Sequence, residues 1–336
     1  MKSAFRLWLF LMVWSGVIDA DHRAWADAGA RESVAQLRTA IERGYSYREV
    51  HVVDWAAEWR RHEPRLLAAP SPRAFAEVAG EMLAATRDPH IWLTAGNELV
   101  PAFRRDVRSE INVGPALLPS LIQGWNQVHP VVATGEVAPG IGYIAIHSWE
   151  RKHAPGSLEA AFAALAGMAD RSAIIVDVRL NSGGDERLAR EFAGCFIRQR
   201  AKYAQHVTLD PATGGFSAPV ERWVEPTAGR PAYAGRVAVL MGRVNMSSAE
   251  AFLLMMRQAP KATLVGGRSY GASGNPQPHP LANGVTVFLP SWKALFPDGT
   301  PLETVGIAPT VEVKTTPTDF TRADPVLEKA IEVVRQ

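Results

Sequence analysis

The chain has 336 residues, of which 47% are hydrophobic and 21% are charged, the composition of an ordinary globular protein with one large domain or two modest ones. Its 36 basic and 34 acidic residues leave a formal charge of +2, and the arginines are scattered singly, which argues against a nucleic-acid partner. The only cysteine, Cys195, excludes an intramolecular disulfide and a cysteine-based metal cluster, and its apolar neighbours predict a buried thiol.

The first residues have the pattern of an export signal. Basic residues precede an apolar run from Leu7 to Val17, and Ala24-Trp25-Ala26 matches a small-residue cleavage site. We therefore expect a signal peptide over residues 1–26, with Ala20 as the alternative cleavage position, and an exported protein that is periplasmic or secreted. The run is about eleven residues, short of the roughly 20 that a spanning helix needs, so we expect no stable membrane span after cleavage; a retained anchor is the alternative.

The N-terminal third is predicted to be mostly helical. Apolar residues recur at helical spacing from Arg31 to Arg43 and from Ser71 to Thr86. A polar, poorly periodic stretch from Glu98 to Glu110 follows. We expect an N-terminal helical cap over residues 27–105 and a connecting segment over residues 106–135.

After residue 135, short apolar strands alternate with amphipathic helices, the pattern of an α/β core over residues 136–336. An Asn283-Gly284 turn between apolar residues predicts a hairpin within Ala282–Lys293. The expected strands are Gly142–Ile146, Ala173–Val178, Arg236–Met241 and Ala262–Val265, and the expected helices are Leu158–Met168, Glu186–Arg198 and Ser248–Gln258.

A pair of serines opens the last of these helices. Ser247 and Ser248 follow an apolar strand and stand where helix-terminal N–H groups favour negative charge, a good position for a nucleophile. In the alternative interpretation, one of the two hydroxyls is a helix cap and Glu250 supports the first turn. The segment by itself leaves both interpretations open.

A second segment, Asp177–Gly184, leaves a strand and enters a helix through Gly183 and Gly184. Two glycines allow backbone N–H groups to turn toward an oxyanion. The segment also fits a plain turn in which Asp177 and Arg179 form a structural ion pair. It lacks the Gly-Lys-Ser/Thr of a phosphate-binding loop and the glycine spacing of a dinucleotide site.

In order and spacing, four segments between Gly142 and Val313 resemble the C-terminal processing (tail-specific) serine peptidases and the tricorn core. They are Gly142–Ile146, the Asp-x-Arg-x-Asn-x-Gly-Gly of residues 177–184, Ser247-Ser248-Ala249-Glu250, and the closing run from Pro297 to Pro309. The resemblance implies a crotonase/ClpP-like α/β core, a peptide or protein substrate, no cofactor, and Ser247 as the nucleophile. It also allows assembly into a homo-oligomer.

The resemblance is closer to the branch that lacks a catalytic lysine. Tail-specific enzymes carry a Gly-Lys pair whose lysine is the base, and here the pair reads Gly271-Ala272. The tricorn-like branch uses a histidine from the N-terminal region and a glutamate near the C-terminus, roles that the resemblance gives to His90 and Glu303, although Pro89 replaces the serine that tricorn-type sites carry before the histidine. The implied oxyanion hole is made by the N–H groups of Gly183, Gly184 and Ser248.

We therefore expect a serine-type peptidase in which His90 takes the proton of Ser247 and Glu303 holds the imidazole. The alternatives are a surface or capping role for His90, a structural role for Glu303, and a non-catalytic protein that binds peptides or apolar ligands on the same scaffold. The segment between His90 and Gly142 is too short for a PDZ module, so none is expected. The histidines lack the spacing of a zinc pair, so no metal site is expected.

Overall fold

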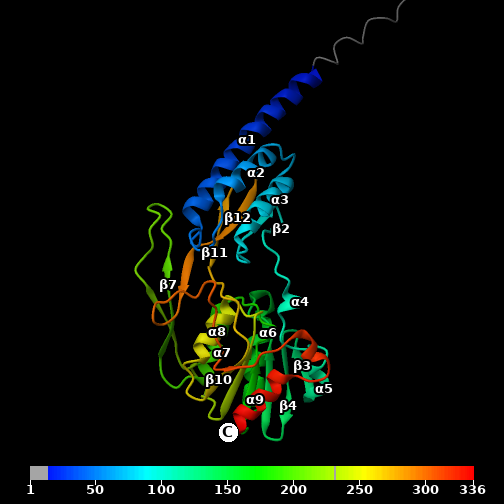
Figure 1. Ribbon diagram of the computed structural model, residues 1–336, viewed down its shortest axis with the longest axis vertical. Coiled ribbons are helices and arrows are strands. Elements are labelled where there is room, and N and C mark those ends of the chain that lie inside the picture. The colour runs from blue at the N-terminus through cyan, green and yellow to red at the C-terminus, as the bar shows by residue number, and fades with distance from the viewer. Residues whose placement is uncertain (1–13, 231) are drawn as a thin grey trace, which may run out of the picture. The chain divides into compact units, whose positions relative to one another are not determined.

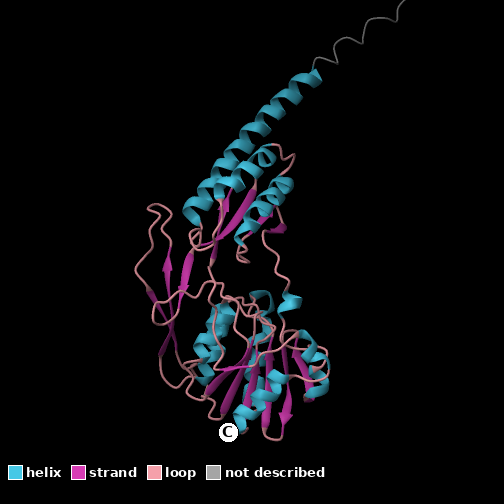
Figure 2. Ribbon diagram, viewed as in Figure 1, coloured by secondary structure: helices cyan, strands magenta, loops and turns pink. Residues whose placement is uncertain are grey.

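The computed structural model describes residues 14–230 and 232–336, with side chains from residue 29 onward except that of Ala154. Residues 1–13, which include much of the apolar run of the expected signal peptide, lie outside this description, so that expectation stays a prediction. Among the described residues, no helix combines the length and the apolar character needed to cross a membrane. By their internal contacts the residues divide into two compact units (Figures 1 and 2). Of the described residues, unit 1 comprises those within 1–104, 210–214 and 275–291, and unit 2 comprises those within 105–209, 215–274 and 292–336.

Unit 1 combines helices with a four-stranded antiparallel sheet of order β11-β12-β1-β2. Its helices are α1 (Trp14–Gly44), α2 (Trp55–Leu67) and α3 (Pro72–Leu83), and its strands are β1 (Trp92–Ala95), β2 (Glu98–Pro101), β11 (Pro276–Pro280) and β12 (Val285–Pro290). Side-chain N-caps mark the start of two of the helices. The side chain of Asp54 accepts the Ala57 N–H at the start of α2, and that of Ser71 accepts the Ala74 N–H at the start of α3.

The sheet of unit 1 adds strands that the expectation of a mostly helical cap did not include. The hairpin predicted at Asn283-Gly284 is confirmed, since β11 and β12 pair antiparallel and Gly284 has a φ of +82°. It pairs, however, with β1 of the N-terminal segment, and residues 275–291 therefore belong to unit 1 rather than to the expected core. Strands of four residues carry too little periodicity for their pairing to be read from the sequence.

Unit 2 is built on a seven-stranded sheet of order β14-β10-β9-β6-β5-β4-β3. The five strands from β14 to β5 are parallel, while β4 and β3 continue the sheet antiparallel. Its strands are β3 (Gln123–His129), β4 (Val132–Ala138), β5 (Ile141–Ile146), β6 (Ala173–Asp177), β9 (Arg236–Met241), β10 (Ala262–Gly266) and β14 (Val311–Glu312). The four predicted core strands are confirmed as β5, β6, β9 and β10.

Helices cover both faces of this sheet, which explains the unbroken apolar runs of its central strands. On one face, Ile174 and Val176 of β6 pack with Phe192 and Phe252 from the helices. On the other face, Ile175 packs in a cluster with residues of α9. The helices are α6 (Ala154–Ala166), α7 (Glu186–Ala193) and α8 (Ser248–Met256) on the first face and α9 (Pro325–Arg335) on the second. Cys195 is buried in the first cluster, as predicted.

The segment expected to connect the two domains is part of the core of unit 2. Residues 106–135 supply α4 (Val107–Glu110), α5 (Leu118–Leu121), β3 and the start of β4. Strand β3 lies at the edge of the sheet, most of its side chains are exposed, and its pairing with β4 is irregular, so it has no apolar alternation to predict it. A further three-stranded sheet of order β13-β7-β8 completes the unit, with β7 (Ala201–Thr208), β8 (Val220–Val224) and β13 (Trp292–Leu295).

Candidate active site

Ser247 occupies a strained turn between β9 and α8. Its φ of +56° and ψ of −129° place a residue with a side chain in a region that favours glycine, and such strain collects at functional sites because surrounding contacts must hold it. The N–H of Ser247 donates to the carbonyl of Ala272 at 2.7 Å. Ser247 is the N-cap of α8, yet its side chain makes no capping hydrogen bond. Ser247 therefore stands at the N-cap position of α8, but its hydroxyl does not act as a cap.

Glu250 does not support the first turn of α8 as a capping box would. Its carboxylate is buried and accepts hydrogen bonds from the Ser269 hydroxyl and from the N–H groups of Gly271 and Ala272. Burial, reinforced by the nearby charge of Glu303, raises the pKa of Glu250 to about 7 in spite of these donors. Glu250 therefore connects the nucleophile helix to the loop that carries Ala272.

The closing segment of the resemblance packs against the same loop. The N–H of Ile307 donates to the Ser269 hydroxyl at 2.7 Å, and the N–H of Thr304 donates to the carbonyl of Gly271 at 2.8 Å. Glu303 is 4% exposed, and its Oε2 accepts the N–H of Ser273 at 3.1 Å. Ser247 and Glu303 are thus attached to one loop, residues 269–273.

The expected oxyanion segment lies beside the nucleophile. A Cβ added at Gly183 would lie 3.0 Å from the Cβ of Ser247 and 3.2 Å from the N of Ser248. The N–H of Gly183 already donates to the side-chain oxygen of Asn181 at 2.9 Å. Gly184 has a φ of +136°, and its carbonyl accepts the Ser248 hydroxyl at 2.7 Å. Of the three expected oxyanion donors, Gly184 and Ser248 therefore fit the role better than Gly183.

A buried amide connects the nucleophile turn to the oxyanion segment. The side-chain nitrogen of Asn245 donates to the carbonyls of Val178 and Asn181 at 2.6 and 2.9 Å, and its oxygen accepts the N–H of Gly242. The side chain of Asn181 reaches in turn to the carbonyl of Ile146 at 3.1 Å. These amides satisfy backbone groups of two irregular turns that would otherwise be buried without partners.

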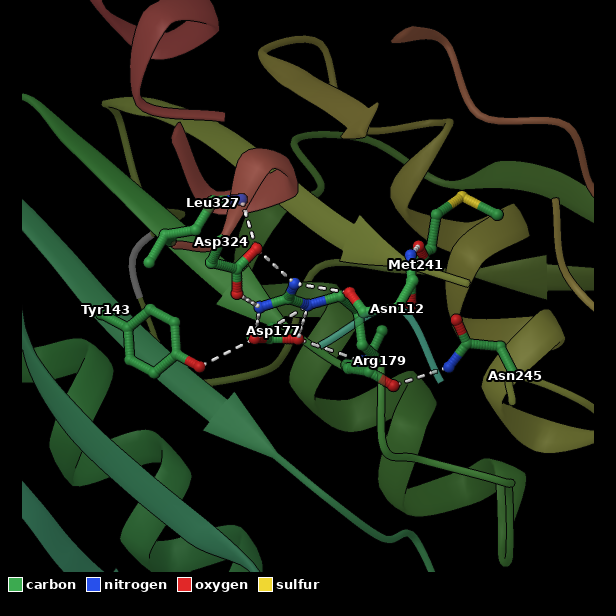
Figure 3. A network of polar contacts seen from close by, with 9 residues as sticks. Asn112, Tyr143, Asp177, Arg179, Met241, Asn245, Asp324 and Leu327 are labelled. Atoms are coloured by element: carbon green, nitrogen blue, oxygen red, sulfur yellow. Dashed lines mark hydrogen bonds and ion pairs between the residues drawn. The ribbon is translucent and has the colours of Figure 1, made fainter. Parts of the chain in front are cut away.

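Arg179 forms the structural ion pair that was the alternative interpretation of its segment. Figure 3 shows its guanidinium between Asp177 and Asp324, with the carbonyl of Asn112 as a further acceptor. The hydroxyl of Tyr143 donates to Asp177, and Asp324 also accepts the Leu327 N–H at the start of α9. Burial opposes the charges, but the carboxylates raise the pKa of Arg179 and the arginine lowers that of Asp177. This network fixes α9 to the strand that leads to the oxyanion segment.

His90 belongs to unit 1, where it lies in a buried polar cluster. The backbone N–H of His90 donates to Asp88 Oδ1 at 2.8 Å, and the ring Nδ1 of His90 is 3.7 Å from the same oxygen. Asp88 Oδ2 accepts the hydroxyl of Tyr45 at 2.9 Å and lies 3.8 Å from His51 Nε2. Burial works against the charge of Asp88, but His90 and His51 hold its pKa below the ordinary value. A carboxylate in this position orients histidine rings.

The predicted site residues come from both units of the chain. Ser247, Gly183, Gly184, Ser248 and Glu303 lie in unit 2, and His90 lies in unit 1. Lys261, which precedes β10 and donates to the Ala234 carbonyl, lies at the opposite end of the parallel strands from Ser247 and is not its base. Several residues support these groups without a sequence signal for that role. They are Asn181, although it stands in the Asp-x-Arg-x-Asn-x-Gly-Gly motif, and Asn245, Ser269, Asp324, Tyr45 and His51. A Ser-x-x-Glu spacing was the signal for Glu250, and no signal existed for contacts made across the fold.

Comparisons with known proteins give the family and the fold of the chain. The sequence model of peptidase family S41 matches residues 140–313, a span of 174 of the 336 residues. No match to a curated relative was found. A putative peptidase from Parabacteroides merdae shares 22% identity at a TM-score of 0.76, covering 92% of this chain and 97% of that one. The photosystem II D1 C-terminal processing protease shares 14% identity at a TM-score of 0.53, covering 92% and 97%. The tricorn protease shares 16% identity at a TM-score of 0.56, covering 91% of this chain and 37% of its own.

The likeness to these solved structures, all below 25% identity, shows the fold. The family match covers the three segments that build the Ser247 site. The predicted α/β peptidase core and the resemblance that suggested it are both confirmed. The chain belongs to peptidase family S41.

Proposed function

We propose that this protein is a serine peptidase that cleaves peptide bonds through an acyl-enzyme on Ser247. One observation carries the proposal: Ser247 is held at a positive φ at the start of α8, beside two glycines, and its hydroxyl makes no capping bond. A serine that served only as a cap would place its oxygen on the N–H of the second or third helical residue. Strain without a capping bond is what a nucleophile on a turn requires.

In the proposed mechanism His90 acts as the general base. It takes the proton of the Ser247 hydroxyl as the oxygen attacks the substrate carbonyl carbon, and Glu303 stabilises the imidazolium. The tetrahedral intermediate collapses when the C–N bond breaks, and the imidazolium gives its proton to the leaving amine. Water then hydrolyses the acyl-enzyme by the same route.

The N–H groups of Gly184 and Ser248 are proposed as the oxyanion donors. Ser248 is the first residue of α8, so its N–H adds the positive end of the helix dipole. Gly184 reaches its φ of +136° without the strain that a side chain would cause, since an added Cβ would lie 2.2 Å from the carbonyl carbon of Trp149. Gly183 contributes by allowing the close approach and not by its N–H.

The proposed substrates are peptides or proteins outside the cytoplasm. The solved structures with this fold include a protease named for C-terminal processing, and processing of polypeptide ends is the corresponding hypothesis for this chain. The expected cleavage after Ala26 is compatible with the fold. Among the residues of α1 from residue 29 onward, the buried ones fall between Ser33 and Gly44, beyond the cleavage site. Assembly into a homo-oligomer stays a hypothesis.

Hydrolysis of a peptide library by purified variants tests the mechanism. Ser247→Ala and His90→Gln should each reduce kcat/KM by at least about 1,000-fold, because nucleophile and base act as a unit. Ser120→Ala, an exposed serine of α5, is the matched control and should retain the wild-type rate. Full activity in folded Ser247→Ala would overturn the proposal.

Export is tested separately by sequencing the N-terminus of the protein isolated from its native host. The proposal expects Asp27 as the first residue and recovery outside the cytoplasm. Recovery of an uncleaved chain from the cytoplasm would contradict it.

A further inference from the structure

The geometry assigns to Glu250 the role of a positioning residue, which holds the backbone of Ser247 in its reactive conformation through the loop at residues 269–272. The inference rests on the proposed function, because it concerns the same nucleophile. It gives Glu250 a role that neither the family match nor the triad of Ser247, His90 and Glu303 includes.

Contacts with neighbouring residues hold the backbone of Ser247. A non-glycine residue at positive φ costs on the order of 1–3 kcal/mol, so it persists only where neighbouring contacts impose it. At its carbonyl, Ser247 accepts the N–H groups of Glu250 and Ala251, which are ordinary helix bonds. At its N–H, the acceptor is the carbonyl of Ala272 at 2.7 Å. That carbonyl is the contact from outside the helix that fixes the turn.

Side-chain hydrogen bonds hold Ala272 in turn. Residues 268–275 form no helix or strand, so no regular ladder positions this carbonyl. The Glu250 carboxylate contributes to that task, because it accepts the N–H groups of Gly271 and Ala272 at 2.8 and 3.1 Å and the hydroxyl of Ser269. Other contacts hold the neighbouring residues, since the N–H of Tyr270 donates to the Asn245 carbonyl and that of Thr304 to the Gly271 carbonyl. The contact made at the N–H of Ala272 itself is the one with Glu250. Residue 272 thus receives a hydrogen bond from α8 at its carbonyl and donates one to α8 at its N–H. The two contacts close a ring between the helix and the loop.

The hydrogen-bond partners of residue 250 require a carboxyl group there. Two of its three partners are backbone N–H groups, which can only donate. Glutamine would place its NH₂ group against the N–H of Gly271 or that of Ala272, whichever way the amide is turned. A protonated glutamic acid avoids this conflict, because Ser269 can reverse and accept the proton. The site therefore accepts either form of glutamic acid and rejects the isosteric amide.

The charges that face Glu250 are few. Glu303, from the closing segment, is the neighbouring ionisable group, and it acts against the negative charge of Glu250. The buried carboxylate has neutral donors as its hydrogen-bond partners among the described residues, in contrast to the carboxylates around Arg179. A buried carboxylate without a counter-ion lowers stability. Its presence here therefore points to a role in positioning the loop.

The test compares Glu250→Gln with wild type in the full-length mature protein. A fluorophosphonate reports the reactivity of Ser247, and its rate constant at saturation should fall by about 10- to 100-fold in the variant, since misplacement of a nucleophile by a fraction of an ångström has effects of that size. The reversible binding constant of the same reagent should change by less than about 3-fold, because the variant alters the serine backbone and not the binding surface. Glu159→Gln, on the exposed side of α6, is the matched control and should react like wild type.

Hydrogen exchange supplies a readout that does not depend on activity. In Glu250→Gln, the amides of residues 268–275 and of Ser247 should exchange faster, while those of β5 (Ile141–Ile146) keep the wild-type rate. Unchanged reactivity and exchange in the folded variant would overturn the assignment. If wild type itself fails to react at Ser247, the proposed function fails, and the exchange result still decides whether Glu250 orders the loop.

A second variant covers the case in which Glu250→Gln does not fold. Ser269→Ala removes one donor to the carboxylate and leaves both N–H groups on it, and it also removes the acceptor of the Ile307 N–H. The expected result is a folded protein whose rate constant for phosphonate labelling falls by about 3- to 10-fold with little change in binding. A rate equal to that of wild type would overturn the assignment.

Discussion

Arg179 and Glu250 are two fully buried charged residues of the same unit, and their surroundings differ in one respect. Arg179 lies between the carboxylates of Asp177 and Asp324, and this pairing raises its pKa further above the ordinary value. Glu250 has only neutral hydrogen-bond donors and a carboxylate, Glu303, nearby, so burial raises its pKa to about 7. A buried charge with a counter-ion stays charged and serves the architecture, whereas one without a counter-ion can change its protonation near neutral pH.

The largest expected effect follows from breaking the ion-pair network. Arg179→Met leaves the carboxylates of Asp177 and Asp324 buried without a counter-ion, which should lower the free energy of unfolding by about 3–5 kcal/mol. Urea denaturation followed by tryptophan fluorescence measures the change. Arg187→Met is the control, because its ion pair with Asp185 is at the surface and is worth less than about 1 kcal/mol. Equal stability of the two variants would contradict the distinction between buried and exposed pairs.

Glu250 makes the stability of unit 2 depend on pH with a defined sign. Its pKa is about 7 in the fold against a model value of 4.5, so the folded state binds more protons between these values. The contribution of Glu250 to the free energy of unfolding is therefore fully present below pH 4.5. It is lost as the pH rises through 7, by an amount on the order of 3 kcal/mol. The difference in urea midpoint between wild type and Glu250→Gln, measured from pH 5 to 8, should change over this window. A pH-independent difference would contradict the assigned environment.

Asp177 should show the opposite sign. Its pKa lies below the model value of 3.8, so its stabilising contribution is present above that value and is lost as the pH falls below it. Arg179→Met should abolish the part of the acid unfolding transition that depends on this pair. An identical acid transition in wild type and variant would show that the pair does not control it.

A smaller effect is expected at the amide that connects the two turns. Asn245→Ala removes hydrogen bonds to the carbonyls of Val178 and Asn181 and should cost about 2–3 kcal/mol of unfolding free energy. Because the same residue positions the nucleophile turn beside the oxyanion segment, fluorophosphonate labelling of Ser247 should also slow. A loss of stability with unchanged labelling would separate the two roles and contradict the account of the turn.

The smallest effect is expected in unit 1, far from these networks in the sequence. Ser71→Ala removes the cap of α3 and should cost about 1 kcal/mol. Thermal unfolding measures the change, and labelling of Ser247 should be unaffected. Slower labelling in this variant would show that the folding of unit 1 controls the nucleophile.

The sequence could predict the features that depend on local pattern. The four buried strands, the helix that begins at Ser248 and the Asn283-Gly284 hairpin follow from apolar runs, helical spacing and turn chemistry, and all are observed. The four-stranded sheet of unit 1 could not be predicted, because β12 pairs with β1 across nearly 200 residues and neither strand is long. Pairing over such a distance depends on tertiary packing and not on propensity.

The candidate site shows the same limit. Ser247, the glycine pair and Glu303 were found through ordered motifs, and the Asp177–Arg179 pair through its spacing. The partners that complete these groups come from elsewhere in the chain. Asp324 reaches Arg179 from the C-terminal helix, and Ser269 reaches Glu250 from a loop without a motif. A contact of this kind has no signature in a single sequence.

Intact-mass measurement after treatment with a fluorophosphonate, on wild type and on Ser247→Ala, tests the central claim most directly. The account predicts one adduct on the wild type and none on the variant. A wild type that is folded and carries no adduct, or a variant that is labelled as fully as the wild type, would contradict Ser247 as the activated nucleophile.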